Sequence, residues 1–461
     1  MSRTDFVYSP GIVVKMSFPI FVELFLQMLV GNIDQIMVSR YSQDSVAAIG
    51  IGNQVMNIII IVVSVTSAAT TIKISRYLGE GGKERRIAQT GSLSVLISLI
   101  IAVLCTAVAV GMRMNIFSAL NVPDEILGET SAYLSIVGAF IVVQALYASF
   151  SAILRAYGYM KEIMAVSVVM NAANIIGNAI LINGLLGMPR LGIIGAAIST
   201  DFSKLLGLAL MYTLYRRKVA PVIAKGAGCR KRGCQISVHY LKPFPKKILR
   251  DMMWLGIPSA GESFSYSMSQ VVILGFINIY GTSVINTKVY CSLFANIAYI
   301  FSMAVSQAAQ VVIGYLIGSN QLEKVTRCIW DTIKLSLAVS VSITFVIWLF
   351  SDFMFGIFTD DPVVLSLGKR VMFVEIFLEI GRSFNITMAR NMVSIGDIMF
   401  PITICIIFAW GISVAGSYIV GVALGFGLVA MWCTMAADEL TRAVVFSLRL
   451  KSGVWLKKKN F

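Results

Sequence analysis

Apolar residues gather in twelve stretches, which are separated from one another by charged residues, glycine or proline. A helix needs about 20 apolar residues to cross the hydrocarbon core of a bilayer. The pattern therefore predicts an all-α polytopic membrane protein with twelve transmembrane helices. Their expected ranges are 16–38, 46–75, 88–110, 130–154, 162–184, 191–215, 252–279, 284–315, 329–350, 363–389, 395–417 and 421–448.

The composition supports this fold class and excludes several others. Apolar residues make up 57% of the 461 residues and charged residues only 13%, where a soluble globular protein carries roughly 25%. A soluble enzyme, a disordered chain and an ordinary nucleic-acid-binding protein are therefore excluded. The net charge of +15 does not indicate nucleic-acid binding, because the excess of Lys and Arg is confined to two segments. These segments, 216–250 and 442–461, contain no acid.

Loop charges predict the orientation of the chain in the membrane. An even number of spans puts both termini on one side, and loops rich in Lys and Arg stay in the cytoplasm. The segment 216–250 and the tail are basic, whereas the segments 111–130 and 351–361 carry more acids than bases. We expect a protein of the cell membrane with both termini cytoplasmic. A long first span follows a short polar start, so no cleavable signal peptide is expected.

The chain also repeats itself at a nearly constant offset. Four matching pairs, each 239 residues apart, are Pro19 and Pro258, Glu23 and Glu262, Tyr41 and Tyr280, and Pro123 and Pro362. Repeats of six spans insert with the same orientation, so the two six-helix bundles should be related by a pseudo-two-fold axis along the membrane normal. The expected domains are an N-terminal lobe (1–217), a basic cytoplasmic linker (218–247) and a C-terminal lobe with a basic tail (248–461).

Two bundles of like orientation favour a secondary transporter, whose shared cleft opens to either side of the membrane in turn. The sequence has no Walker-type Gly-Lys-Ser/Thr loop for nucleotide hydrolysis. Seven cysteines are present, but the spacing of Cys229, Cys234 and His239 fits no standard zinc site. We therefore expect no metal cofactor.

Six short segments of the first repeat carry a family resemblance. They are Gly31 to Val38, Val46 to Gly50, Leu154 to Gly158, Asn174 to Ile182, Pro189 to Gly192, and Gly195 to Thr200. Together they resemble the multidrug and toxic compound extrusion family, and the likeness covers nearly the whole chain when the repeat is counted. The resemblance implies cation-coupled export through a central cleft between two six-helix lobes.

Five residues are candidates for binding the coupling ion. Asp34 is the strongest, because an ionisable group at bilayer depth is costly and usually faces a cavity or a partner. The alternative is a carboxylate that is merely hydrated near the outer end of its helix. The resemblance places Asn174 and Asn178 where some branches of the family have an Asn-x-x-x-Asp pair, so Asn178 removes a negative charge. Interhelical hydrogen bonds explain both amides equally well. Thr200 adds a hydroxyl, and Glu262 is included because a glutamate of the seventh helix couples transport in some branches.

Other polar residues of the spans are expected to bind substrate, namely Gln35, Gln54, Asn57, Asn171, Gln307 and Glu375. In the tenth span, Glu375, Glu379 and Arg382 share one helix face, and this spacing favours an internal ion pair between Glu379 and Arg382. The same reasoning predicts a pair between Asp201 and Lys204. It also predicts that Arg442 pairs with its acidic neighbours Asp438 and Glu439.

These observations favour a secondary active antiporter, and not an enzyme, that exports cationic amphiphilic compounds or drugs by alternating access. The exchanged ion is expected to be H⁺ or Na⁺. We expect no other cofactor, and no metal other than a sodium ion that could bind at Asp34. We expect a monomer in a lipid bilayer that binds organic cations and no nucleic acid. A flippase for a lipid-linked amphiphile is the first alternative, but few Lys or Arg lie mid-span to hold a diphosphate. An intramembrane enzyme comes third, since Asp360 and Asp361 are followed by Pro362 in a loop.

Overall fold

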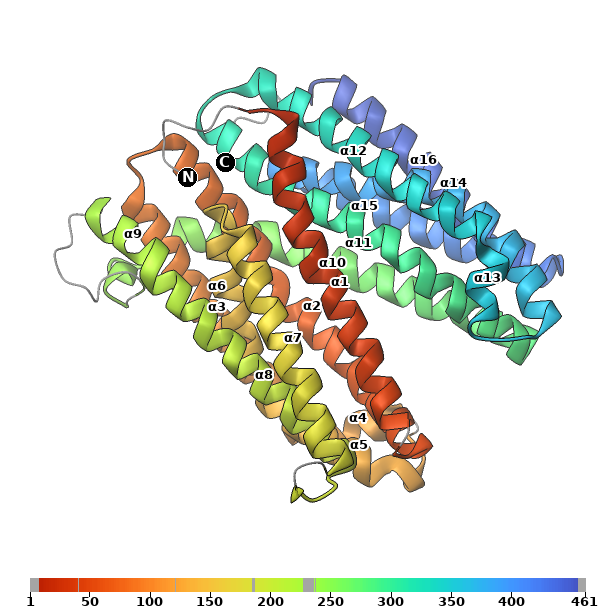
Figure 1. Cartoon of the computed structure of the whole chain (residues 1–461). Helices are drawn as coiled ribbons and strands as arrows, with labels where there is room; N and C mark the ends of the chain where they lie inside the picture. The colour runs from red at the N-terminus through yellow and green to blue at the C-terminus, as the bar shows by residue number, and fades with distance from the viewer. Residues whose placement is uncertain are drawn as a thin grey trace. The chain divides into compact units, whose positions relative to one another are not determined.

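The computed structural model of the chain describes residues 8–39, 41–120, 122–184, 187–226, 236 and 238–454, and over these residues its regular structure is helical without a strand. Figure 1 shows the path of the helices. The α-helices of the first half are α1 (Pro10–Ser39), α2 (Gln43–Glu80), α3 (Glu84–Gly111), α4 (Arg113–Ala119), α5 (Asp124–Ala139), α6 (Ile141–Ala156), α7 (Met160–Asn183), α8 (Gly192–Leu214) and α9 (Ala220–Gly226). Those of the second half are α10 (Lys246–Ile277), α11 (Thr282–Gly318), α12 (Leu322–Leu349), α13 (Ser351–Gly356), α14 (Pro362–Ser394), α15 (Met399–Phe408) and α16 (Gly427–Lys451).

Each of the twelve predicted spans overlaps at least one helix. Within the described residues, eight helices are long and apolar enough to cross a bilayer by themselves. The pair α5 and α6 makes a ninth span, and the two helices meet at a bend of 42° inside the predicted range 130–154. The other three spans, α10, α14 and α16, carry acidic residues among their apolar ones, which lowers their hydropathy.

The boundary between the last two spans lies later than the sequence pattern predicts. The eleventh span runs over Met399–Ala423 and includes the π-helical segments Ala409–Val414 and Ser417–Ala423, so the predicted break between 417 and 421 is wrong. Gly425 and Gly427 have φ of 75° and 72°, a left-handed backbone that favours glycine, and they form the turn into α16. Hydropathy missed this boundary because the apolar run continues up to the turn.

The chain divides into two compact units. The first unit covers Val22–Gly256, and the second continues from Ile257 and also includes the start of α1 up to Phe21. The beginnings of α1 and α10 thus belong to the unit opposite to the rest of each helix. In each helix the boundary between the two units lies close to a proline, Pro19 in α1 and Pro258 in α10. These are the two prolines that the sequence repeat aligns.

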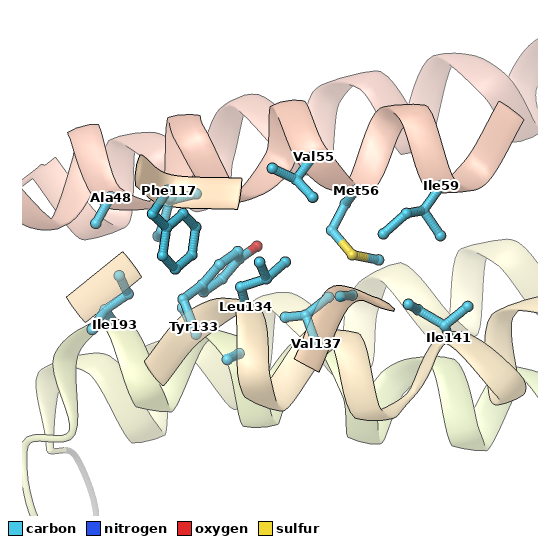
Figure 2. Packing of buried hydrophobic residues seen from close by; sticks show 14 of the residues in the cluster. Ala48, Val55, Met56, Ile59, Phe117, Tyr133, Leu134, Val137, Ile141 and Ile193 are labelled. Carbon is cyan, nitrogen blue, oxygen red and sulfur yellow. The ribbon is translucent and has the colours of Figure 1, made fainter. Parts of the chain in front are cut away.

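A hydrophobic core in the first unit holds α2 against α5. Figure 2 shows Val55 on the α2 side and Leu134 on the α5 side among the buried side chains of this core. Gly52 of α2 lies under the ring of Tyr133, where a Cβ atom would come within 2.6 Å of the ring. The Tyr133 hydroxyl donates a hydrogen bond to Asn53 Oδ1 at 3.0 Å. The absence of a side chain at Gly52 therefore allows α5 to sit close to α2.

In the second unit, α14 packs against α11, α12 and α16. Gly381 of α14 touches the backbone of α16, where a Cβ atom would lie 2.6 Å from the carbonyl carbon of Glu439. Any larger residue would push the two helices apart, since that contact is with backbone. The close crossing brings the charged residues of α14 and α16 together within the membrane-spanning part of the unit.

Candidate ion-coupling site

Four predicted residues from three helices of the first unit are joined by hydrogen bonds. Asn178 of α7 donates from Nδ2 to Oδ1 of Asp34 in α1 at 2.5 Å. The same nitrogen lies 3.5 Å from Oδ1 of Asn174, one helical turn earlier. Asn174 in turn donates from Nδ2 to the hydroxyl of Thr200 in α8 at 3.2 Å. The structure therefore brings Asp34, Asn174, Asn178 and Thr200 into one polar site.

Tight packing of α7 on α8 holds two of these helices in register (Figure 1). Gly195 of α8 lies against the backbone of α7, where a Cβ atom would be 2.7 Å from the carbonyl oxygen of Leu181. Ser199 donates from its hydroxyl to the backbone carbonyl of Asn174 at 2.9 Å. Asparagines four residues apart share a helix face. This face is the one that reaches both α1 and α8.

The amides of α7 are buried, and not all of their polar atoms are paired. Asn178 is 0% exposed and Asn174 is 3% exposed, whereas Asp34 is half-buried. Among the described residues, Asn178 Oδ1 has no hydrogen-bond partner, and neither has Nδ2 of Asn171, which is predicted to bind substrate and is also buried. Buried polar atoms are usually paired, so unpaired ones point to a position for water, an ion or a ligand. The interhelical hydrogen bonds predicted for the asparagines are present, from Asn178 to Asp34 and from Asn174 to Thr200, and their ion-coupling role stays a prediction.

Asp201, next to Thr200 of this site, does not form the ion pair that its spacing predicts. It follows Thr200 in α8, is 2% exposed, and neither carboxylate oxygen has a hydrogen-bond partner within the described part of the chain. The predicted ion pair between Asp201 and Lys204 is wrong, because no hydrogen bond or ion pair joins these two side chains among the described residues. Lys204 instead interacts electrostatically with both Asp201 and Asp34. A spacing of three residues permits contact on a helix but does not enforce it.

The remaining predicted residues of the first unit lie apart from this network. Gln35 of α1 and Gln54 and Asn57 of α2 are exposed on the unit's surface. No hydrogen bond connects them to Asp34 among the described residues. Their substrate-binding role stays a prediction. Of the cysteine and histidine group, Cys229 and Cys234 lie outside the described residues, as does the side chain of His239.

The oxygen atoms at Asp34 are of the type that a hard cation prefers, namely carboxylate, amide and hydroxyl oxygens. Over the part of the chain that the structure describes, no three His, Cys, Asp or Glu side chains come together as they would around a transition metal. Asp34 Oδ1 already accepts the short hydrogen bond from Asn178. The donor set therefore suits a proton or a weakly bound monovalent cation better than a resident metal ion.

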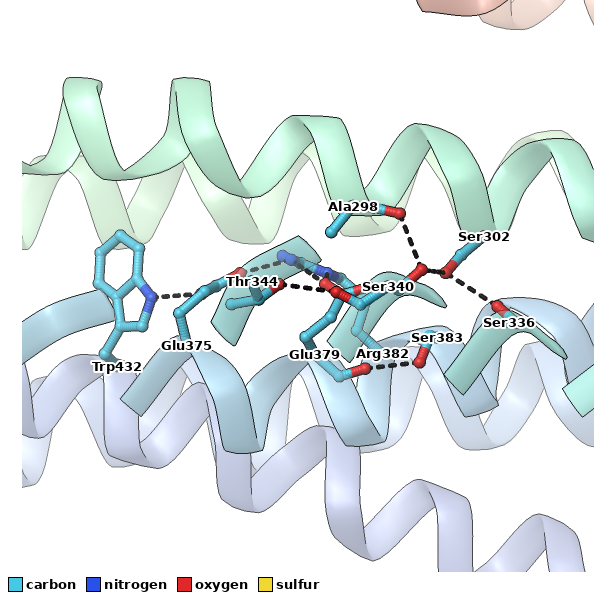
Figure 3. Close-up of polar contacts among 10 residues, drawn as sticks. All are labelled: Ala298, Ser302, Ser336, Ser340, Thr344, Glu375, Glu379, Arg382, Ser383 and Trp432. Atoms are coloured by element: carbon cyan, nitrogen blue, oxygen red, sulfur yellow. Dashed lines mark hydrogen bonds and ion pairs between the residues drawn. The ribbon is translucent and has the colours of Figure 1, made fainter. Parts of the chain in front are cut away.

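The second unit holds a different kind of polar cluster, in which the charges are paired (Figure 3). Arg382 of α14 forms ion pairs with both Glu375 and Glu379, and Trp432 of α16 donates from Nε1 to Glu375 at 2.7 Å. The predicted Glu379–Arg382 pair is confirmed. Glu375 is 1% exposed, and each of its oxygens has a partner from the protein.

A second triad lies beside the first. Arg442 of α16 pairs with Asp438 at 2.8 Å and with Glu439 at 2.7 Å, as predicted. Asn385 of α14 donates to the Glu439 carboxylate at 2.7 Å. A cavity of about 310 Å³ lies within the unit and is lined by acids of both triads, including Glu375, and by Lys288. Glu375 is thus at a cavity, as a substrate-binding residue would be, but it is also bound to an arginine.

Glu23 and Glu262, which the repeat aligns, both lie near an arginine of the fourth helix of their own repeat. Glu23 is 4% exposed and pairs with Arg155 of α6 at 3.0 Å. Glu262 is half-buried in α10 and interacts electrostatically with Arg390 of α14. The ion pair with Arg155 gives Glu23 a structural partner within the first unit. The coupling role of Glu262 stays a prediction, as does the role of Gln307, which is half-buried in α11.

Comparison with known families identifies the fold. The MatE family model matches the chain twice, over residues 19–180 and 258–419. The chain is a member of the multidrug and toxic compound extrusion (MATE) family. The two matches start and end 239 residues apart, which confirms the internal repeat read from the prolines and glutamates.

Relatives of this MATE chain cover almost its full length. It is 33% identical over 446 residues to the uncharacterized transporter YisQ of Bacillus subtilis, covering 96% of this chain and 94% of that protein. It is 25% identical to the probable multidrug resistance protein NorM of Thermotoga maritima, covering 96% of this chain and 93% of that protein.

Solved structures show the same fold. A MOP superfamily transporter from Pyrococcus furiosus superposes with a TM-score of 0.86 at 20% identity, over 98% of this chain and 97% of its own. An outward-facing MATE multidrug resistance transporter gives a TM-score of 0.85 at 19% identity, over the same shares of the two chains. The predicted class, an all-α membrane protein with twelve spans in two six-helix bundles, is confirmed. This MATE chain is thus a multi-pass membrane protein with the fold of a transporter.

Proposed function

We propose that this MATE chain is a secondary active antiporter that exports cationic amphiphilic compounds in exchange for H⁺ or Na⁺ by alternating access. It works as a monomer in the cell membrane with both termini in the cytoplasm. The observation that carries the proposal is the hydrogen-bonded site of Asp34, Asn178, Asn174 and Thr200, in which no cationic side chain of the described residues contacts the acid. An acid in that setting exchanges its counter-ion as the site opens to one side and then the other.

The name of one relative supports the proposed direction and substrate class. NorM of Thermotoga maritima is described as a probable multidrug resistance protein. The aromatic and methionine content (26 Phe, 16 Tyr and 23 Met) suits flat apolar cations, which bind through cation–π and soft sulfur contacts. Binding of the coupling ion at Asp34 from outside then favours release of the substrate.

The energy available depends on the charge of the substrate. A pH difference of one unit supplies about 1.4 kcal/mol, which sustains a concentration ratio of about 10 at one-to-one exchange. A membrane potential of about 100 mV adds about 2.3 kcal/mol only when net charge moves. One proton exchanged for one monovalent cation moves no net charge. Such a substrate is driven by the pH difference alone, and a neutral substrate by both.

The test is efflux of ethidium from proteoliposomes with an imposed ion gradient. Asp34→Asn keeps the size of the side chain and removes its charge, so we expect gradient-driven efflux to fall to the level of empty vesicles. Asp360→Asn is the matched control, since Asp360 is an exposed acid in a loop. Efflux that persists in Asp34→Asn at the wild-type rate would remove Asp34 from the coupling mechanism. Imposing each gradient separately identifies the ion.

A further inference from the structure

Helix α7 carries its polar side chains on a single face. Between positions 163 and 182 its polar residues, which we call the polar stripe, are Ser167, Asn171, Asn174 and Asn178. Their spacing of four, three and four residues keeps them within about 60° of one another around the helix axis. All four are at most 7% exposed, whereas Val169 and Ile176 on the opposite face are 47% and 60% exposed. The polar stripe therefore faces the interior of the first unit.

Interhelical hydrogen bonds explain one end of the polar stripe and not the other. Asn178 and Asn174, nearer the end of α7, bond to side chains of α1 and α8. Nearer the start of α7, the Nδ2 group of Asn171 and the hydroxyl of Ser167 have no hydrogen-bond partner within the described residues. Ser167 is 0% exposed and Asn171 is 7% exposed. Burying a polar atom without a partner costs free energy, so these two groups need a partner that the packed side chains do not supply.

The spacing and chemistry of the polar stripe fit water. Residues four apart on a helix are about 6 Å apart along its axis, and one water that bridges two groups through hydrogen bonds of about 2.8 Å spans nearly that distance. A buried water makes about three hydrogen bonds, and amides and hydroxyls offer it both donors and acceptors. From Ser167 to Asn178 the stripe covers about 16 Å, roughly half of the hydrocarbon core.

We propose that the polar stripe of α7 holds a chain of water molecules along which the proton of Asp34 leaves toward the start of α7. Asn171 and Ser167 are positioning residues that hold this water. The inference rests on the proposed antiport function and deepens it, because it names the proton as the exchanged ion and gives its route. In the proposed orientation the start of α7 is cytoplasmic, so the stripe is the release path.

The step conserves protons and charge. Asp34 gives its proton to the first water and becomes a carboxylate, each water passes one proton to the next, and one proton leaves at the far end. A sodium ion could not use the same route. It needs several oxygen ligands at once, whereas the polar stripe presents about one polar group per helical turn.

The experiment separates proton movement from substrate movement. Full-length protein in proteoliposomes is assayed for ethidium efflux driven by a pH gradient. It is also assayed for exchange of labelled against unlabelled ethidium at equal pH, which needs no net proton transfer. Asn171→Leu removes the amide and keeps the size of the side chain. We expect it to slow pH-driven efflux about tenfold, the effect of losing one hydrogen bond along the path, and to leave exchange near the wild-type rate.

Two further variants complete the comparison. Asn171→Gln keeps an amide and should keep most of the pH-driven efflux. Val169→Leu, on the exposed face of the same helix, is the matched control and should change neither rate. If Asn171→Leu fails to fold, Ser167→Ala tests the same path with the loss of a single hydroxyl, and it should slow efflux and not exchange.

The outcomes distinguish the water path from the proposed function. Equal loss of efflux and exchange in Asn171→Leu would mean that this residue binds substrate, and it would overturn the inference. Wild-type efflux in both Asn171→Leu and Ser167→Ala, or wild-type efflux driven by a Na⁺ gradient alone, would also overturn it and leave antiport intact. Efflux that no ion gradient drives in wild type would instead overturn the proposed function itself.

Discussion

The polar residues of the two units are organised in opposite ways. In the first unit, Asp34 accepts a hydrogen bond from an amide, and Asp201 accepts none from the residues that the structure describes. In the second unit, two arginines bind four acids in two adjacent triads, and Trp432 and Asn385 add donors to them. One family model matches both halves, so the difference lies in the side chains of a repeated unit.

This contrast separates a site that can change its charge from one that is fixed. A carboxylate bound by an arginine at short range has a fixed counter-charge, and removing the partner leaves a costly buried charge. A carboxylate held only by an amide can gain or lose a cation with less change in the protein. We therefore expect substitutions in the second unit to affect stability most, and substitutions in the first unit to affect transport most.

The largest stability effect is expected from Arg382→Met. The arginine side chain is 14% exposed, and its removal leaves the side chains of Glu375 and Glu379, which are 1% and 0% exposed, without their cation. Loss of one partner from a buried pair costs about 3–5 kcal/mol. Thermal unfolding of the purified protein in detergent measures the loss.

An exposed arginine of the same unit provides the control. Arg327 is 73% exposed and lies 3.9 Å from Asp331, so Arg327→Met should cost no more than about 0.5 kcal/mol. The triple variant Glu375→Gln/Glu379→Gln/Arg382→Met removes all three charges and should recover part of the stability. Equal unfolding temperatures for Arg382→Met and Arg327→Met would show that the triad does not stabilise the second unit.

A matched pair of donor deletions gives the next largest effect and compares the units directly. Trp432→Phe removes one neutral donor to Glu375, and Asn178→Leu removes one neutral donor to Asp34. A hydrogen bond to a charged group contributes about 1.5–3 kcal/mol, so Trp432→Phe should lower stability by that amount. Asn178→Leu should change stability by less than about 1 kcal/mol, because it also removes the unpaired Oδ1 and fills the space with an apolar group.

Transport should respond in the reverse order. Ethidium efflux should fall strongly in Asn178→Leu and remain near wild type in Trp432→Phe, at a temperature where both variants are folded. Unfolding curves and efflux rates from the same preparations provide the comparison. If Trp432→Phe abolishes efflux while Asn178→Leu does not, the transported ion binds in the second unit and not in the first.

Most of the architecture was readable from the sequence because it depends on features of single segments. Apolar length predicted all twelve spans, and the spacing of Pro19 and Pro258 predicted the repeat. The turn at Gly425 and Gly427 was missed, since no charged residue marks it and hydropathy does not report backbone conformation. The kink between α5 and α6 was missed for the same reason.

The site was only partly readable, because it depends on contacts between segments far apart in sequence. Helical spacing put Glu379 and Arg382 on one face, and that local pair was correct. The same reasoning failed for Asp201 and Lys204, because Lys204 also responds to Asp34 from another helix. Sequence spacing also could not show that Asp201 is buried without a hydrogen-bond donor among the described residues.

The smallest effect we predict also compares the two repeats, at the loop before the fourth span. Asp361 caps α14: it accepts from the backbone N–H of Val363 at 2.9 Å and from the hydroxyl of Ser283 at 2.8 Å. These donors hold the pKa of Asp361 below its ordinary value. The position 239 residues earlier is Val122, and α5 begins without a side-chain cap.

A carboxyl whose pKa is lowered by folding stabilises the protein above its ordinary pKa, and that contribution is lost as the pH falls through the lowered pKa. Asp361→Ala should therefore lower the unfolding temperature slightly at pH 7, and the gap to wild type should narrow as the pH falls below about 3.9, the ordinary pKa of an Asp. Val122→Ala, in the uncapped repeat, should show no such pH-dependent gap. A gap for Asp361→Ala that stays constant between pH 7 and pH 3 would mean that the residue acts through packing and not through its charge.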